Sequence, residues 1–230
     1  MFLAVINEST QMPETAVQRA VACCAKQLKI HVAPAWNMVP APVIYYASKT
    51  QAPQNADILT ILDDTDQAGF LGYHRLTPDG KPYSRVFVNP VLNHGGELLK
   101  SEMSVSAVLS HEVCEWFADA YVNLWADGPE GSYAMEICDP VDELSYQVDG
   151  VSVSDFVFPR FFDPVAAPGT RFDHMEKVSR PFTPLSGGQL QVRKDGTVTV
   201  VGGAGVPDWK KQMREFPAAR TARRDARQNG

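Results

Sequence analysis

The sequence has no apolar run long enough to cross a membrane, few cysteines and no internal repeat. Its longest apolar runs, residues 42–47 and 56–62, fall far short of the ~20 residues that span a bilayer. Residues 1–7 are apolar but lack the basic segment of a secretory signal, and Glu8 follows them closely. These absences argue against a membrane or secreted protein, and we expect a cytoplasmic location with no membrane partner.

Four cysteines in 230 residues are too few for a disulfide-built protein. Two of them, Cys23 and Cys24, are adjacent, which is not the spacing of a disulfide framework. We expect reduced thiols. The chain is 44% hydrophobic and 21% charged, as in globular proteins with a sizeable core, and its length favours one main domain with an appendage.

Charge is distributed unevenly. Residues 210–230 hold seven basic and two acidic residues, so the rest of this chain of net charge -6 is strongly acidic. An acidic body argues against nucleic-acid binding by the main domain. The basic tail either binds an acidic protein surface or nucleic acid, or is simply a solvated end. We therefore predict a domain over residues 1–209, with subdomains 1–120 and 121–209, and a tail over 210–230.

Hydrophobic periodicity predicts an α+β fold in which a small mixed twisted sheet packs on helices. Residues 2–7, 43–46, 58–62 and 85–88 have strand patterns, the last preceded by a hairpin turn at 77–81 and expected at a sheet edge. Helical spacing covers residues 13–28 and 101–118, the second capped by Ser101 or Ser104. An irregular region follows Asp119, with a β-hairpin at 188–202 around Lys194-Asp195-Gly196.

The helix predicted at 101–118 carries the sequence His111-Glu112-Val113-Cys114-Glu115. Residues four apart share a helix face, so His111 and Glu115 can bind one metal ion. Glu112 points elsewhere and can take a proton from a water molecule as general base. The surrounding sequence is strongly apolar, and burying three ionisable groups there is costly unless they are paired or bind metal.

This stretch resembles the HExxH motif of zincin metallopeptidases, with Glu115 in place of the second histidine. In zincins the motif helix follows a small twisted sheet, as in the element order read here. The gluzincin branch takes its third ligand from a downstream glutamate, followed by an aspartate that orients a ligand histidine. By that resemblance Glu136 completes the ligand set of His111 and Glu115, and Asp139 lies in the second shell. Asp119 is a further second-shell candidate.

The resemblance implies a metal-dependent hydrolase, a peptidase relative, whose peptide substrate adds along the edge strand near residues 85–88. One imidazole and two carboxylates would bind Zn²⁺, with Mn²⁺ or Fe²⁺ in competition. His74 and His94 lie near predicted turns; either can approach the cleft, but surface or loop-capping roles are the more frequent and are what we expect.

Several alternatives stay open. The motif could be a buried polar network without metal, a site that includes thiolates of Cys114 or Cys138, or a Ca²⁺ site without chemistry. The metzincin pattern fits less well, because Tyr121 stands where its third ligand would be. Two features favour a different class of protein, a non-catalytic structural or assembly component such as a virion protein. Glu115 stands in place of the second motif histidine, and the C-terminal tail is basic.

Overall fold

The computed structural model describes residues 1–67, 69–142, 144–167 and 169–202. The fold over these residues is mixed α+β, as the sequence predicts. The predicted basic tail, 210–230, and the last seven residues of the predicted domain lie outside the described residues.

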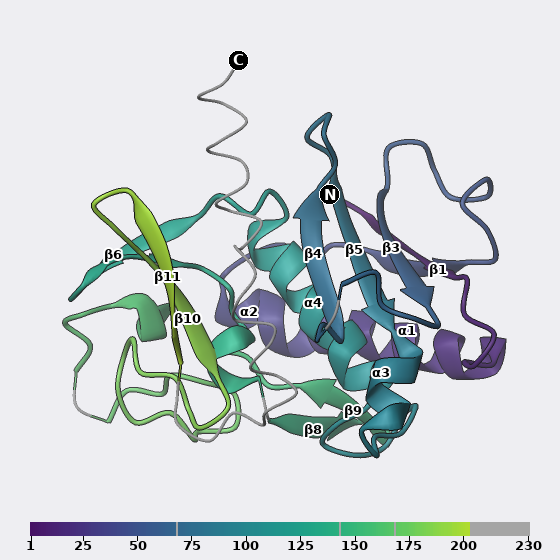
Figure 1. Ribbon diagram of the computed structural model, residues 1–230. Helices are drawn as coiled ribbons and strands as arrows, with labels where there is room; N and C mark the ends of the chain where they lie inside the picture. Colours follow the sequence, from purple (N-terminus) through teal and green to yellow (C-terminus); the bar gives the residue numbers. More distant parts are fainter. Residues whose placement is uncertain (68, 143, 168, 203–230) are drawn as a thin grey trace.

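A five-stranded mixed sheet forms the first half of the molecule (Figure 1). The strand order is β2-β1-β3-β5-β4, in which β4 alone runs antiparallel to its neighbour. Four consecutive residues of β1, Leu3 to Ile6, are buried, so this strand is covered on both faces, whereas burial alternates along most of β5. Its strands are β1 (Leu3–Asn7), β2 (Val43–Tyr46), β3 (Asp57–Leu62), β4 (Gly72–Leu76) and β5 (Pro82–Phe87).

The hairpin predicted at residues 77–81 joins β4 to β5, and Gly80 adopts the positive φ of 84° that its turn requires. The expectation that residues 85–88 form an edge strand is wrong, because β5 pairs with β3 on one side and β4 on the other. The two edges of the described sheet are β2 and β4, and β4 is a strand that the sequence pattern did not reveal. Val88 begins a short helix, α3 (Val88–Asn93), rather than ending the strand.

Helices α1 (Glu14–Gln27) and α4 (Val105–Asp119) pack on the same face of this sheet. α1 begins one residue later than predicted, with Pro13 at its N-cap rather than in its first turn. It continues through a π-helical turn, η1 (Leu28–Val32), into α2 (Ala33–Ala35). The N-cap of α4 is Ser104, whose side chain accepts a hydrogen bond from the Ala107 amide at 3.2 Å.

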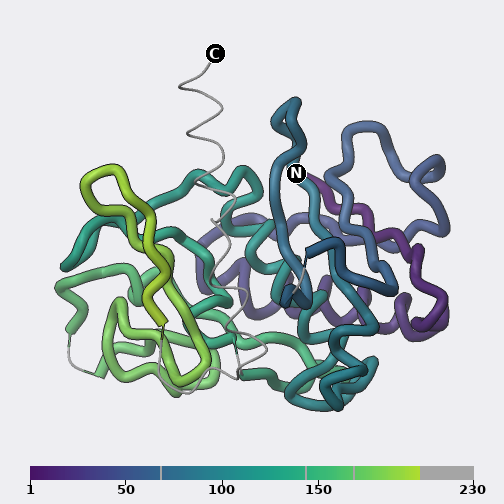
Figure 2. The backbone as a smooth tube through the Cα atoms, in the orientation of Figure 1, coloured from purple at the N-terminus to yellow at the C-terminus, as the bar shows by residue number. Residues whose placement is uncertain are grey.

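Short strands form the second half of the described chain, on the other side of α4 from the five-stranded sheet (Figure 1). One antiparallel sheet has the order β11-β10-β7-β6, and β8 pairs with β9. Figure 2 shows the predicted hairpin of residues 189–202 in yellow-green at the left of the molecule. The elements are β6 (Trp125–Gly128), β7 (Gly131–Ala134), η2 (Asp139–Val141), β8 (Ser145–Val148), β9 (Val151–Ser154), η3 (Pro159–Phe162), β10 (Gln189–Lys194) and β11 (Thr197–Gly202).

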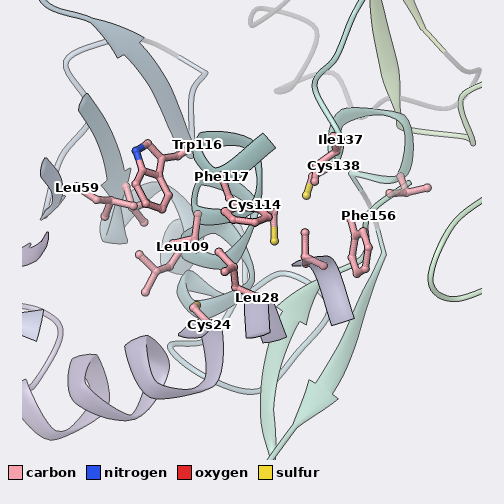
Figure 3. Packing of buried hydrophobic residues seen from close by; sticks show 14 of the residues in the cluster. Cys24, Leu28, Leu59, Leu109, Cys114, Trp116, Phe117, Ile137, Cys138 and Phe156 are labelled. Carbon is pink, nitrogen blue, oxygen red and sulfur yellow. The ribbon is translucent and has the colours of Figure 1, made fainter. Parts of the chain in front are cut away.

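One hydrophobic cluster runs from the five-stranded sheet through α4 to the second half (Figure 3). Trp116 and Leu109 of α4 face the sheet side, and Cys114 faces Cys138 and Phe156. All four cysteines are free and buried. In the part of the chain that the structure describes, no helix has the length and apolar character needed to cross a membrane.

Candidate metal centre

The centre is built on α4, which runs through the middle of the molecule. Glu112 and Glu115 are buried, with 4% of each residue exposed. Ser110, which precedes His111, fixes the position of α4 by two hydrogen bonds. Its hydroxyl donates to Gln27 of α1 at 2.9 Å and accepts from the Ser154 amide at 2.7 Å. Gln27 in turn donates to the Ser154 carbonyl at 2.7 Å. Every atom of this network is buried, so the position of the motif relative to α1 and β9 is well determined.

The first candidate ligand group is formed by His111, Glu115 and Asp139, whose ligand atoms all lie within 4.8 Å of one another. His111 Nε2 lies 3.2 Å from Glu115 Oε1 and 3.6 Å from Asp139 Oδ1. The other ring nitrogen, Nδ1, lies 3.6 Å from Asp142 Oδ1. A histidine that binds a metal through one nitrogen and faces a carboxylate with the other is the usual arrangement of metal centres.

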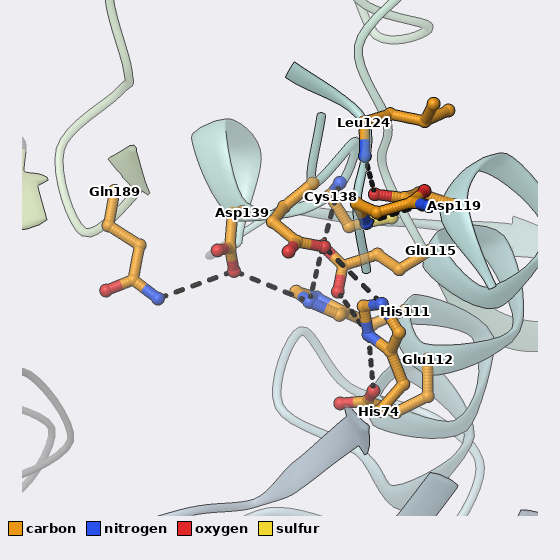
Figure 4. A network of polar contacts seen from close by, with 11 residues as sticks. His74, His111, Glu112, Glu115, Asp119, Leu124, Cys138, Asp139 and Gln189 are labelled. Carbon is orange, nitrogen blue, oxygen red and sulfur yellow. Dashed lines mark hydrogen bonds and ion pairs between the residues drawn. The ribbon is translucent and has the colours of Figure 1, made fainter. Parts of the chain in front are cut away.

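A second group shares Glu115 and adds His74 and Glu112 (Figure 4). His74 Nδ1 lies 3.3 Å from Glu115 Oε2 and 3.7 Å from Glu112 Oε2. His74 is on β4, where it is buried opposite Ser84 of β5. The expectation of a surface or loop-capping role for His74 is therefore wrong. Its burial depends on the pairing of β4 at the sheet edge beside α4, which no local sequence signal shows.

The acidic residues that follow the motif, Asp119, Glu136 and Asp139, have contacts that differ from the roles implied by the resemblance. Asp139, expected to orient His111, is in its ligand group, and Gln189 of β10 donates to Asp139 Oδ1 at 3.4 Å. Glu136, expected to be a ligand, belongs to neither group; its Oε2 lies 3.5 Å from His74 Nε2. Asp119 accepts hydrogen bonds from the Asn123 and Leu124 amides at 3.0 and 2.8 Å, so it organises the loop that follows α4.

Burial and mutual charge determine the pKa values in the centre. Burial lowers the pKa of His74, but the carboxylates of Glu136, Glu112 and Glu115 outweigh it and hold that pKa well above its usual value. The pKa of His111 is raised in the same way, burial being outweighed by Glu115 and Asp139. These shifts arise because the carboxylates of Glu112, Glu115, Glu136 and Asp139 face the two imidazoles.

The carboxyl groups respond differently to the same surroundings. Burial raises the pKa of Glu112, against the opposing effect of His74. Burial and the charge of Glu115 raise the pKa of Asp139 to about 7. Glu115 is the exception: burial opposes its charge, but His111 and His74 on either side lower its pKa. Glu115 is therefore the anion around which the two histidines are arranged.

These residues fit a divalent cation. Each group offers one imidazole nitrogen and carboxylate oxygens, a donor set suited to Zn²⁺, Mn²⁺ and Fe²⁺. His74 Nε2 and Glu112 Oε2 are buried atoms without a hydrogen-bond partner among the described residues, which is costly in a protein interior. Cys114 and Cys138 belong to neither group, and burial raises the pKa of Cys138 well above its usual value, which opposes thiolate ligation.

Comparisons with protein-family models, with curated proteins and with solved structures found no match.

Proposed function

We propose that this protein is a metal-dependent hydrolase, a zincin-like peptidase relative, with its ion held by His111, Glu115 and Asp139. The observation that carries the proposal is the convergence of His111 and Glu115 of α4 with Asp139 of η2, while Glu112 lies on the same buried helix as the first two. The set differs from the one inferred from the motif alone, since Asp139 replaces Glu136 as third ligand. Zn²⁺ is the ion proposed, with Mn²⁺ or Fe²⁺ as competitors for a site with two carboxylates.

An ion in this site would polarise a substrate carbonyl and make a water molecule more acidic. Glu112 is the proposed general base, which takes a proton from the water at its carboxylate and returns it to the leaving amine. Its raised pKa, caused by burial, suits a group that must both accept and release a proton. Asp142 orients His111 from the far side of the ring, at 3.6 Å.

The substrate class proposed is a peptide or protein. Among the described strands β4 pairs only with β5, and it packs against α4, so its other edge runs beside the centre. An extended peptide can add to such an edge by main-chain hydrogen bonds. The element order of strand, helix, further strands and motif helix also supports the zincin-like proposal, as does the position of His111, Glu112 and Glu115 on the last of these.

The test is Glu112→Gln, assayed with an unstructured protein such as casein and with a fluorogenic peptide library. We expect turnover to fall by about 10²–10⁴-fold, the usual contribution of a general base, while the first ion is retained. The control is Glu102→Gln, an exposed glutamate near the start of the same helix. No turnover by the natural protein loaded with Zn²⁺, Mn²⁺ or Fe²⁺ would favour the non-catalytic alternative, a structural or assembly protein.

A further inference from the structure

The group formed by His74, Glu112 and Glu115 is not explained by a single ion at His111. The two carboxylate oxygens of Glu115 face opposite ways: Oε1 lies 3.2 Å from His111 Nε2, and Oε2 lies 3.3 Å from His74 Nδ1. Glu115 therefore directs one carboxylate oxygen to each imidazole. Bridging carboxylates in two-metal sites have the same arrangement, with one oxygen on each ion. Glu115 thus belongs to both groups, and the two groups share no other member.

Two buried atoms of the second group, His74 Nε2 and Glu112 Oε2, have no hydrogen-bond partner among the described residues. Glu112 Oε2 is buried and has no hydrogen bond within the described chain, although it lies 3.7 Å from His74 Nδ1. The side chains of His74 and Glu112 are 6% and 5% exposed, so bulk water does not solvate them. A buried carboxylate oxygen without a partner is costly, and a cation between His74 and Glu112 would remove that cost.

The surroundings of both side chains hold them toward this position. Gly72 of β4 leaves space for Glu112, since a Cβ at residue 72 would lie 2.8 Å from Glu112 Oε1 and 2.9 Å from Val108 Cγ1. His74 turns Nδ1 toward the group and Nε2 toward Glu136 Oε2, at 3.5 Å. This repeats the arrangement of His111, whose rear nitrogen faces Asp142. Both histidines are therefore placed between an outer carboxylate and a ligand group.

We propose that a second divalent transition-metal ion binds between His74, Glu112 and Glu115, and that Glu115 bridges it to the first. The proposal rests on the proposed function for the first ion. Charge supports two ions, because Glu112, Glu115, Glu136, Asp139 and Asp142 surround only two imidazoles. An ion on Glu112 occupies the proposed general base, so we expect hydrolysis to fall when the second site fills.

The experiment titrates the metal-free full-length protein with Zn²⁺ and with Mn²⁺, and measures bound metal after equilibrium dialysis. We expect two equivalents for the natural protein and one for His74→Ala. Glu136→Gln should weaken the second equivalent by about 10–100-fold, because it removes the charge of the outer carboxylate that faces His74 Nε2 at 3.5 Å. With Mn²⁺, we expect the electron paramagnetic resonance spectrum of a spin-coupled pair in the natural protein and of an isolated ion in His74→Ala. The control is His94→Ala, an exposed histidine.

Saturation of the natural protein at one equivalent, unchanged by His74→Ala, would overturn the second ion and leave the proposed function intact. Binding of no ion by the natural protein would overturn both. If His74→Ala does not fold, Glu112→Gln removes a ligand of the same group with little change of shape, and it should also bind one equivalent. Two equivalents in Glu112→Gln with unchanged affinity would contradict the proposed ligand set.

Discussion

At the scale of single residues, the centre depends on close packing around Glu112. Gly72→Ala introduces a methyl group that meets Glu112 Oε1, Val108 Cγ1 and the Arg85 carbonyl within 3.1 Å. We expect a loss of about 1–3 kcal/mol in the free energy of unfolding, the usual cost of overpacking, together with weaker binding of the second metal equivalent. Denaturant unfolding and metal titration measure the two effects. A variant as stable as the natural protein, with unchanged metal binding, would show that Glu112 does not need this space.

Single residues also mark the limit of prediction from sequence. The five-residue motif identifies His111, Glu112 and Glu115: helical spacing places the first and last on one face, and Glu112 lies beside them on the same helix. His74 precedes His111 by 37 positions, and only the pairing of β4 with β5 brings its side chain to the metal centre. Between Glu115 and Asp139 the chain leaves α4, passes Val122 at a φ of 50° and forms the short strands β6 and β7. No periodic pattern could show whether Glu136 or Asp139 would face His111.

At the scale of elements, α4 must be held rigidly for its side chains to converge. Gln27→Leu removes the partner of the Ser110 hydroxyl and of the Ser154 carbonyl, all buried. We expect unfolding free energy to fall by about 1–3 kcal/mol, because buried polar groups lose their hydrogen bonds. Thermal unfolding measures this. Gln27→Glu, which keeps the acceptor but loses the amide donor, separates the two bonds, and no change in either variant would mean that α4 is held by apolar packing alone.

The start of α4 gives a second prediction at this scale. Ser104→Ala removes the acceptor for the Ala107 amide, and we expect a loss of about 1 kcal/mol in the free energy of unfolding. The matched variant is Ser104→Thr, which retains a hydroxyl and should lose less. Equal stability of the two variants would contradict a capping role for this side chain.

Element boundaries were largely predictable, whereas sheet order was not. Periodicity and caps locate α1, α4, β1, β2, β3 and the two hairpins, because these signals are local. The order β2-β1-β3-β5-β4 is set by pairing between distant segments, so the edge position was assigned to the wrong strand. Strands of four residues such as β6 and β7 carry too short a pattern to distinguish them from loops.

At the scale of the whole molecule, a buried pair of carboxyl groups outside the metal centre should make the free energy of unfolding depend on pH. Asp155 is fully buried next to Asp173, and burial together with Asp173 raises the pKa of Asp155 to about 8. In the unfolded chain Asp155 ionises near pH 4. Between about pH 4 and pH 8 unfolding therefore releases a proton, and the stability that protonated Asp155 contributes is lost as pH rises.

Asp155→Asn tests this linkage, since an amide of the same shape cannot ionise. We expect the stability of the variant relative to the natural protein to increase steadily from pH 4 to pH 8. Urea unfolding of both proteins across this range gives the difference. A difference that does not change with pH would show that the pKa of Asp155 is the same in the folded and unfolded chains.

Binding of the proposed ions should also stabilise the whole fold, because the proposed ligands come from β4, α4 and η2. An ion that binds only the folded chain adds about 2.7 kcal/mol to the free energy of unfolding at a concentration 100 times its dissociation constant.

The most direct test of the metal centre is elemental analysis of protein purified without added metal. It compares the natural sequence with His111→Ala and with His94→Ala, the control at an exposed residue. We expect at least one equivalent of Zn, Mn or Fe in the natural protein and the control, and its loss in His111→Ala. Metal in none of the three, or equal metal in all, would contradict a metal centre at His111, Glu115 and Asp139.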